Sequence, residues 1–476
     1  MTLSVPATRG RDAGREPDPL ALALDRATGA RPIEGNRLEH HPDSPRAIEA
    51  MLELIAAAQR WVHFENYIIR DDRTGRRFGA ALTARAQAGV RVRVLYDGLG
   101  SFGTAHRYWR SLRAAGVEVR PVHPLSPWHL PDVIIRDHRK LVVADGIRAI
   151  TGGLCIGDEW AGDTERQRQP WRDTMVAVSG PAAAALDRTF GRLWEHIGTP
   201  LPPDELEADP PECGTSTVRV VAGTPGRARV YRAVQFLAAT AQERLWITDA
   251  YLIAPPPLYA SLLDAARAGV DVRLLVPGTS DVPVLRDSTR IGYRDLLRAG
   301  ARIFEWQGPM LHAKTLLVDQ RWARVGSSNL NVSSLLGNYE LDVFAECMDL
   351  TAALAGQFLR DIAVSREIVL QAGRRFLPAR LVGAPAATPA AGPEPPHRRS
   401  GYELGAVAVV TLRRVAGGLR RIIAATAGLA LVTLGGLMLL FPRIMSIVIA
   451  GGAFLIALAL GVYAVERRRA QESDDG

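Results

Sequence analysis

The stretch DHRKLVVADG (137–146) contains one of only two lysines in this chain, and LHAKTLLVDQ (311–320) contains the other. In both stretches the lysine follows a histidine by two residues and precedes an aspartate by five. Every other basic residue of the 476-residue chain is arginine. The two side chains exchange readily on a surface but not at a site that needs a compact ammonium group. The two retained lysines therefore mark candidate functional positions.

These stretches belong to an internal repeat. WVHFENYII, from Trp61, aligns with LWITDAYLI, from Leu245. In both copies an Ala-rich helical stretch, a strand (RVRVLYDG or DVRLLVPG), a second helix and the lysine stretch follow in that order. Alternation of strands and helices is typical of α/β units with a largely buried sheet. The sequence therefore predicts two duplicated α/β/α halves that pack face to face with pseudo-twofold symmetry.

Changes of composition divide the chain into seven segments. We expect a disordered N-terminal lead (1–30), a first half (31–200), a linker between the halves (201–215), a second half (216–375), a Pro/Ala-rich linker (376–405), a membrane hairpin (406–470) and a tail (471–476).

The expected hairpin rests on two uncharged runs, 422–441 and 444–465. Each run is long enough to cross a hydrocarbon core of about 30 Å as a helix. Arginines precede the first run and follow the second, whereas only Arg443 lies between them. The positive-inside rule then predicts an inner-membrane protein with two C-terminal spans, whose catalytic part and both termini are cytoplasmic. Two buried soluble helices are the alternative, which the length of the uncharged runs disfavours.

The histidine–lysine spacing favours phosphodiester chemistry. Residues two apart on a strand project from one face, so His138 lies beside Lys140 and His312 beside Lys314. Packing of the halves would bring both pairs into one cleft. One histidine can then attack phosphorus and form a phosphohistidine, while the other protonates the leaving oxygen. The lysines would stabilise charge on the non-bridging oxygens.

No cofactor is expected, and no metal, because no His, Asp or Glu cluster has metal-ligand spacing. An isolated histidine on a strand is usually a satisfied core residue, and the duplicated motif argues against this here. The remaining eight histidines, including His40, His41 and His63, recur in no motif and receive no role.

The overall composition favours an anionic partner but does not identify which kind. A formal net charge of +8 and a pI near 9.7 favour nucleic acid, anionic lipid or phosphorylated substrates. The three cysteines are too few and too scattered for a disulfide framework and form no C-x-x-C pair, which fits a reducing compartment.

The paired H-x-K-x4-D motifs resemble those of the phospholipase D superfamily. The flanking stretches TGGLCIGDEW (151–160), WRDTMVAVSGP (171–181) and GSSNLNVSSLLGNYEL (326–341) are similar to segments of bacterial cardiolipin synthases. The resemblance covers about residues 31–375 and implies two phospholipase D-like halves.

Carried over by position, the resemblance implies roles for nine residues. The catalytic residues would be His138, Lys140, His312 and Lys314, with Asp145 and Asp319 holding the motif geometry. Ser327, Asn329 and Glu340 would surround the histidines, with Asn329 donating to a phosphate oxygen and Glu340 orienting a histidine ring. His138 would be the nucleophile and His312 the acid and base.

The chain also departs from the pattern. Cys155 stands where cardiolipin synthases usually have asparagine, and a thiol cannot replace the donor pair of an amide. Asn331-Val332-Ser333 replaces the D-x-R of the second flank. The expected spans are C-terminal, whereas membrane spans in the family are commonly N-terminal.

The resemblance implies a membrane-anchored phosphatidyltransferase of the cardiolipin synthase type, which would pass a phosphatidyl group from a donor lipid to phosphatidylglycerol. A phospholipase D that releases phosphatidic acid is the first alternative. A nuclease is another, favoured by the pI but not by any basic stretch interleaved with aromatic residues. A non-catalytic membrane scaffold is the last, and the two intact motifs oppose it. The oligomeric state stays open.

Overall fold

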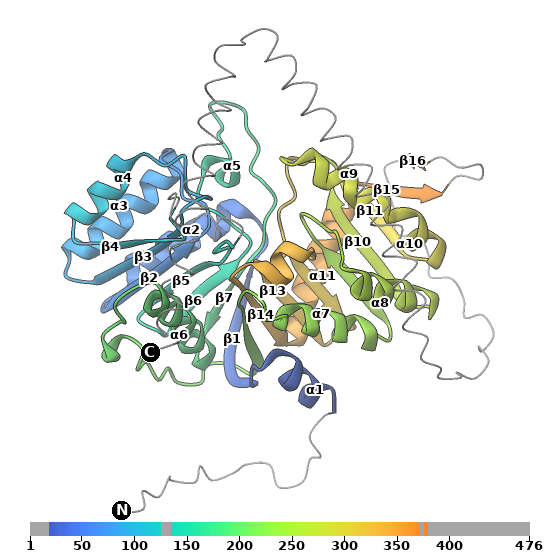
Figure 1. Cartoon of the computed structure of the whole chain (residues 1–476), viewed down its shortest axis with the longest axis horizontal. Coiled ribbons are helices and arrows are strands. Elements are labelled where there is room, and N and C mark those ends of the chain that lie inside the picture. Colours follow the sequence, from blue (N-terminus) through green and yellow to red (C-terminus); the bar gives the residue numbers. More distant parts are fainter. Residues whose placement is uncertain (1–18, 125–134, 371–375, 379–476) are drawn as a thin grey trace, which may run out of the picture. The chain divides into compact units, whose positions relative to one another are not determined.

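The computed structural model describes residues 19–124, 135–370 and 376–378 (Figure 1). After α1 (Pro19–Thr28), the first half contains β1 (Ile33–His41), α2 (Ser44–Ala57), β2 (Trp61–Asn66), α3 (Arg73–Gln87), β3 (Arg91–Asp97), α4 (His106–Ala114), β4 (Glu118–Val122), β5 (Lys140–Ala144), β6 (Arg148–Gly152), α5 (Asp158–Ala161), β7 (Met175–Ser179) and α6 (Pro181–His196).

A 3₁₀ turn, η2 (Pro203–Glu205), lies between the halves. The second half contains β8 (Ser216–Gly223), α7 (Arg229–Thr240), β9 (Arg244–Thr248), α8 (Pro256–Arg267), β10 (Asp271–Pro277), α9 (Pro283–Ile291), α10 (Tyr293–Ala299), β11 (Arg302–Trp306), β12 (Thr315–Val318), β13 (Trp322–Gly326), η3 (Ser333–Gly337), β14 (Glu340–Glu346), α11 (Met348–Ala363), β15 (Ser365–Leu370) and β16 (Phe376–Pro378).

The strand order confirms the duplication. The sixteen described strands form one sheet in the order β16-β15-β11-β10-β9-β12-β13-β14-β8-β1-β7-β6-β5-β2-β3-β4. Read outward from the centre, β8-β14-β13-β12-β9-β10-β11 repeats β1-β7-β6-β5-β2-β3-β4. In each half the last three strands pair in parallel and the others are antiparallel. The order therefore has pseudo-twofold symmetry, and β15 and β16 extend only the second half.

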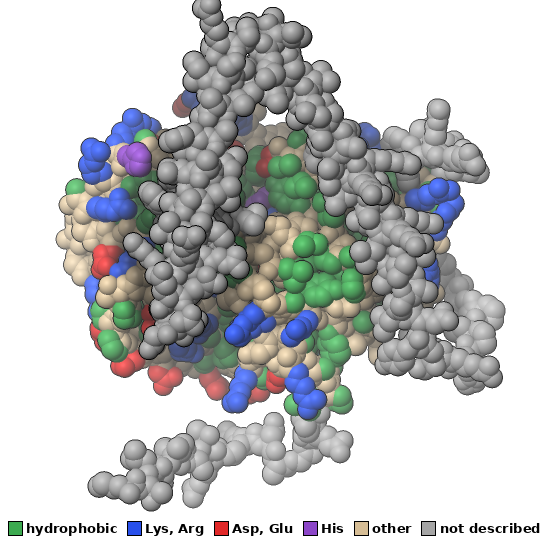
Figure 2. All heavy atoms as spheres, in the orientation of Figure 1, with side chains coloured by type: hydrophobic (Ala, Val, Ile, Leu, Met, Phe, Trp, Pro, Cys, Tyr) green, Lys and Arg blue, Asp and Glu red, His purple; other side chains and the backbone are tan. Residues whose placement is uncertain are grey.

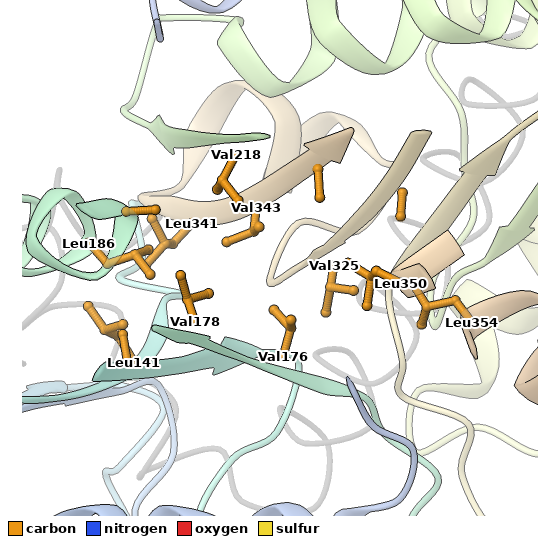
Figure 3. Packing of buried hydrophobic residues seen from close by; sticks show 14 of the residues in the cluster. Leu141, Val176, Val178, Leu186, Val218, Val325, Leu341, Val343, Leu350 and Leu354 are labelled. Atoms are coloured by element: carbon orange, nitrogen blue, oxygen red, sulfur yellow. The ribbon is translucent and has the colours of Figure 1, made fainter. Parts of the chain in front are cut away.

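Three hydrophobic clusters show how the layers pack. One lies between the first-half sheet and α2, α3 and α4, and another between the second-half sheet and α7, α8 and α10. The third joins the two halves and includes α6 and α11. Figure 3 shows side chains of this shared core meeting from the two halves, namely Leu141, Val176 and Val178 with Val218, Val325, Leu341 and Val343. The halves thus share a core between facing sheets.

The strands after the two lysines are buried on both faces, which explains their continuous apolar sequence. Leu141 and Val143 of β5 belong to the shared core, whereas Val142 and Ala144 belong to the outer cluster of the first half. In β12, Leu317 belongs to the shared core and its two neighbours to the outer cluster. Successive side chains on a strand point to opposite faces, so both faces must be apolar.

The halves also join edge to edge through β1 and β8, which pair at Ile33 with Val218 and at Asn36 with Ser216. The buried Asn36 side chain donates to the carbonyl oxygens of Ile33 and Ser216, at 2.7 and 3.3 Å, and accepts from the amide of Ala182 at 2.7 Å. One amide side chain therefore fixes the junction of the two half-sheets.

Two of the expected segments are partly wrong. Within the lead expected to be disordered, Pro19–Thr28 forms α1, because Leu24 is buried in the outer cluster of the second half and Asp25 binds Arg219 at 2.9 Å. At the start of the Pro/Ala-rich linker, Phe376–Pro378 forms β16, which pairs with β15. Residues 1–18 and 379–405 of these segments lie outside the described residues.

The linker between the halves contributes to the core. Glu205 in η2 is fully buried, and its Oε2 lies 3.2 Å from Nε2 of His63, whose Nδ1 lies 2.6 Å from Asp187. His63 is therefore a satisfied core histidine.

The runs expected to span the membrane, 422–441 and 444–465, lie outside the described residues. Within residues 19–124, 135–370 and 376–378, no helix is both long enough and apolar enough to cross a membrane.

Candidate active site

The backbone of each half positions the histidine of the other. The amide of His138 donates to the carbonyl oxygen of Tyr339 at 2.9 Å, and the amide of His312 donates to that of Arg172 at 2.7 Å. Isolated parallel bridges at Asp137–Tyr339 and Arg172–Leu311 accompany these bonds. Each histidine therefore lies at a crossing point between the halves, just before the strand that carries its motif.

The carboxylate that contacts each histidine also comes from the opposite half. Nδ1 of His138 lies 3.1 Å from both carboxylate oxygens of Glu340. Nδ1 of His312 lies 2.7 Å from Oδ2 of Asp173. The site therefore contains two crossed histidine–carboxylate pairs, which neither half could form alone.

Asp173 is the functional residue that the sequence interpretation missed. The register pairs Gly152 with Met175 in the first half and Gly326 with Asp342 in the second. Asp173 and Glu340 each lie two residues before the paired partner, so they occupy equivalent positions in the repeat. Alignment of the two flanks through these strands would have identified Asp173.

Each carboxylate is held by further donors. Glu340 accepts from the hydroxyls of Ser327 at 2.5 Å and Ser334 at 2.6 Å. Asp173 accepts from the indole of Trp160 at 3.1 Å and from the amide of Thr174 at 2.8 Å. Such outer contacts fix the orientation of a carboxylate and hence of the imidazole it holds. The structure places Ser327 in this supporting layer, and Ser334 joins it without having been predicted.

Both lysines are buried beside their histidines. Lys140 and Lys314 are 0% and 1% exposed, and each ammonium group donates to the carbonyl oxygen of its own motif histidine. Nζ of Lys314 also lies 3.0 Å from Nδ1 of His312. Lys140 lies 5.2 Å from the ring centroid of Tyr67. Each lysine therefore lies beside the histidine of its own motif in a buried site, and its charge also lowers the pKa of the histidine in the other half.

Aromatic rings enclose the two imidazoles. Tyr67 meets the ring of His138 edge-on, with centroids 4.9 Å apart. Trp160 and Tyr251 meet the ring of His312 edge-on, at 5.4 and 6.2 Å. Tyr67 and Tyr251 are equivalent in the repeat, so each half supplies one tyrosine to this wall.

Burial and charge set the protonation of the site. Burial and the charge of Lys314 together lower the pKa of His312 to about 4, against the opposing effect of Asp173. Burial also lowers the pKa of His138, against the effect of Glu340. Although burial alone would raise the pKa of Glu340, the neighbouring His138 and Lys140 lower it to about 2. The pKa of Asp173 is likewise lowered by His312, against burial.

Both carboxylates are therefore ionised at neutral pH, and both imidazoles are neutral. An ionised carboxylate can only accept a hydrogen bond, so Nδ1 of each histidine must carry the proton. Nε2 of each ring then carries a lone pair. Burial lowers the pKa of Lys314 to about 8, with Lys140 adding to the effect, so its ammonium group is still mostly charged at pH 7.

The two motif aspartates lie at the far ends of the same strands. Oδ1 of Asp145 accepts from the amides of Arg60 and Trp61 at 2.7 and 2.9 Å, and Oδ2 accepts from the amide of Gln59 at 2.9 Å. One carboxylate therefore satisfies three consecutive backbone amides where the chain enters β2.

Asp319 makes the equivalent contacts in the second half, where the chain enters β9. Its Oδ1 accepts from the amides of Gln242, Glu243 and Arg244, at 3.1, 2.8 and 3.1 Å. Asp145 and Asp319 both adopt positive φ, of 57° and 53°. Both hold the turn that leads into a neighbouring strand, and their side-chain hydrogen bonds go to backbone amides there. These contacts are of the geometry-holding kind that the resemblance implied.

Asn329 and Cys155 make the site unsymmetrical. Each lies three residues after an equivalent glycine, Gly326 or Gly152, and each is buried. Oδ1 of Asn329 has no hydrogen-bond partner among the described residues. Burial raises the pKa of the Cys155 thiol, against the charges of Lys140 and Lys314. The second half therefore supplies an amide at this position, and the first half supplies a neutral thiol.

No metal site accompanies these groups in the part of the chain that the structure describes, where no three His, Cys, Asp or Glu side chains are grouped to hold an ion.

The comparisons with known proteins agree with this geometry. The family model described as cardiolipin synthase, PLD-like domain, matches residues 51–194 and 236–362. The cardiolipin synthase of Geobacillus thermodenitrificans is 34% identical over 369 residues, which cover 73% of each chain. Cardiolipin synthase A of Pseudomonas fluorescens is 35% identical over 328 residues, which cover 68% of each chain.

A solved structure shares the fold. The phosphatidylserine synthase of Haemophilus influenzae Rd KW20 superimposes with a TM-score of 0.58 at 13% identity, covering 74% of this chain and 92% of that one. The family match and the curated relatives extend over both halves and both motifs. The chain therefore belongs to the cardiolipin synthase family of the phospholipase D superfamily and is a phosphatidyltransferase.

Proposed function

We propose that this protein is a membrane-anchored cardiolipin synthase, which transfers a phosphatidyl group to phosphatidylglycerol through a phosphohistidine intermediate. The crossed pairs His138–Glu340 and His312–Asp173 are the observation that carries the proposal. They provide two oriented imidazoles with free Nε2 lone pairs beside two buried ammonium groups. A two-step phosphodiester exchange needs these groups as nucleophile, as general acid and base, and as stabilising cations.

In the first step, Nε2 of His138 attacks the phosphorus of the donor phospholipid. A P–N bond forms, the P–O bond to the head group breaks, and His312 gives a proton to the leaving oxygen. Glu340 stabilises the positive charge that develops on the His138 ring. His312 is neutral at rest, and the negative charge of a bound phosphate favours its protonation before the step.

In the second step, the glycerol hydroxyl of phosphatidylglycerol attacks the phosphohistidine. His312 takes the proton of that hydroxyl, the P–N bond breaks, and His138 returns to its neutral form. Lys140 and Lys314 stabilise the non-bridging oxygens in both steps. His138 is assigned as the nucleophile because the superfamily commonly uses the histidine of the N-terminal motif.

The proposed anchor is the pair of uncharged runs at 422–441 and 444–465, in an inner membrane with the catalytic part and both termini cytoplasmic. An anchored site meets lipid substrates that are already concentrated in the bilayer. A reporter fused after Gly476 should accordingly give a cytoplasmic signal, and a periplasmic signal would contradict this orientation.

The products formed from defined lipids test the proposal. The full chain in detergent micelles receives phosphatidylglycerol alone, then with phosphatidylethanolamine, and the lipids are resolved by chromatography and mass spectrometry. We expect cardiolipin from wild type and from the control His106→Asn, an exposed histidine outside the site, but not from His138→Asn. Phosphatidic acid without cardiolipin would indicate a hydrolase instead, and DNA cleavage without lipid turnover would indicate a nuclease.

A further inference from the structure

A second cationic site includes Arg139, the residue directly before strand β5. It is a cavity of about 710 Å³ between α6, the residues after β8 and the end of α1. Its basic lining residues are Arg139, Arg192, His196, Arg227 and Arg229, and none of the described residues that line it is acidic. We call it the arginine cavity. Figure 2 shows basic side chains gathered between the positions that α6 and α7 occupy in Figure 1.

Arg139 forms the buried wall of the arginine cavity and is only 3% exposed. Its two terminal nitrogens donate to the carbonyl oxygens of Thr189 and Gly223, both at 3.3 Å. Its Nε has no hydrogen-bond partner among the described residues, and Glu65 lies 3.9 Å from Nη1. A buried guanidinium group with an unused donor is costly unless a further acceptor completes it.

The other arginines of the cavity are not neutralised by the protein. Arg192, Arg227 and Arg229 form no ion pair with any residue in the described part of the chain. Burial and the charges of Arg139, Arg188 and Arg229 lower the pKa of Arg192. Several like charges around one hollow favour an anion within it.

We propose that the arginine cavity binds a phosphate group, carried by a free phosphate or by the head group of an anionic phospholipid. Guanidinium groups match phosphate oxygens with paired hydrogen bonds, and the cavity is lined by several of them. The lipid source rests on the proposed function, whereas the binding of phosphate itself does not.

The cavity adjoins the catalytic pair through two residues. Arg139 lies between His138 and Lys140 in the sequence, and its guanidinium group lies 5.5 Å from the ring centroid of Tyr339. The carbonyl oxygen of Tyr339 accepts the His138 amide, and Tyr339 directly precedes Glu340. Two residues that line the cavity are therefore the chain neighbours of both members of the His138–Glu340 pair.

Calorimetric titration of the full chain in detergent tests this site. The probes are inorganic phosphate and dihexanoyl phosphatidic acid, each titrated into wild type, Arg192→Gln/Arg229→Gln and the control Arg110→Gln. Arg110 is an exposed arginine on α4 that does not line the cavity and whose charge is not among those that act on Arg192. The single variant Arg192→Gln provides a milder change if the double variant does not fold.

We expect the Kd for phosphate to rise about tenfold in the double variant, because two of the guanidinium groups that would bind the anion are removed; this corresponds to about 1.4 kcal/mol of binding free energy. The Kd should stay unchanged in the control. Equal affinity in wild type and variants would overturn the proposal, as would the absence of binding to wild type. Tighter binding of the lipid than of inorganic phosphate identifies the head group as the source. Lipid turnover is measured separately. If the protein binds phosphate in the arginine cavity but turns over no lipid, the result contradicts the proposed function and leaves the proposed binding site standing.

Discussion

Glu340 of the second half contacts Nδ1 of His138 in the first half through both of its carboxylate oxygens, at 3.1 Å each. Asp173 and His312 repeat this relationship in the opposite direction, at 2.7 Å. Because each imidazole is oriented by the other half, the duplication creates one site with interlocked parts. The four residues should therefore be sensitive to small changes that leave the fold intact.

Glu340→Gln removes the charge that orients and stabilises the His138 ring while keeping the shape of the side chain. We expect the rate of lipid turnover to fall about 10–100-fold, as for other residues that orient a reacting group. Glu346→Gln, at the other end of the same strand, is the matched control. A rate for Glu340→Gln equal to that of the control would show that this carboxylate has no part in the chemistry.

Asp145→Ala tests whether a motif aspartate supports the fold and not the reaction. Three backbone amides lose their acceptor, so the free energy of unfolding should fall by about 1–3 kcal/mol. Turnover per folded molecule should stay close to wild type, and Asp145→Asn should restore part of the stability. The measurement is denaturant unfolding beside the lipid assay, and loss of turnover without loss of stability would contradict this role.

Asn329 and Cys155 form a natural pair for a test of asymmetry. Asn329→Ala should lower turnover about 100-fold, the effect of removing one donor from a developing oxyanion. Cys155→Ala should change it far less, because a neutral thiol is a weak donor. Similar losses in both variants would contradict the assignment of the phosphate contact to the amide.

Lys314→Met should raise the pKa of His312. Burial and the Lys314 charge together lower this pKa to about 4, so removal of the ammonium group leaves Asp173 to stabilise the imidazolium. Lys140→Met should raise it less, because Lys140 has the smaller effect. Histidine titration by NMR measures both, and an unchanged His312 in Lys314→Met would show that this charge does not control its protonation.

Much of the fold could be predicted from the sequence because the same order of strands and helices occurs twice, so each half supports the interpretation of the other. The apolar runs after Lys140 and Lys314 predict strands buried on both faces, and the structure places them in equivalent positions. The pairing of Asp173 with His312 was not predicted, because it depends on strand register across the halves. The short α1 was missed because its stability comes from contacts with the second half, such as the ion pair between Asp25 and its arginine partner in β8.

The arginine cavity could not be predicted from the sequence either, because it too depends on contacts between distant segments. Arg139, Arg192 and Arg229 come from three distant segments and share no local pattern. Only folding brings them around one hollow, so composition could indicate an anionic partner but not the place where it binds.

The covalent intermediate is the most direct test of the proposed reaction. His312→Asn should be slow in both steps, because His312 protonates the leaving oxygen before it activates the acceptor hydroxyl, so the adduct is sought in wild type during turnover. After brief incubation with phosphatidylglycerol and rapid quenching, mass spectrometry of the peptides should find a phosphatidyl group on His138 in wild type, and none in His138→Asn. A phosphatidyl group on His312 in either protein, or no adduct on His138 in wild type, would contradict the account.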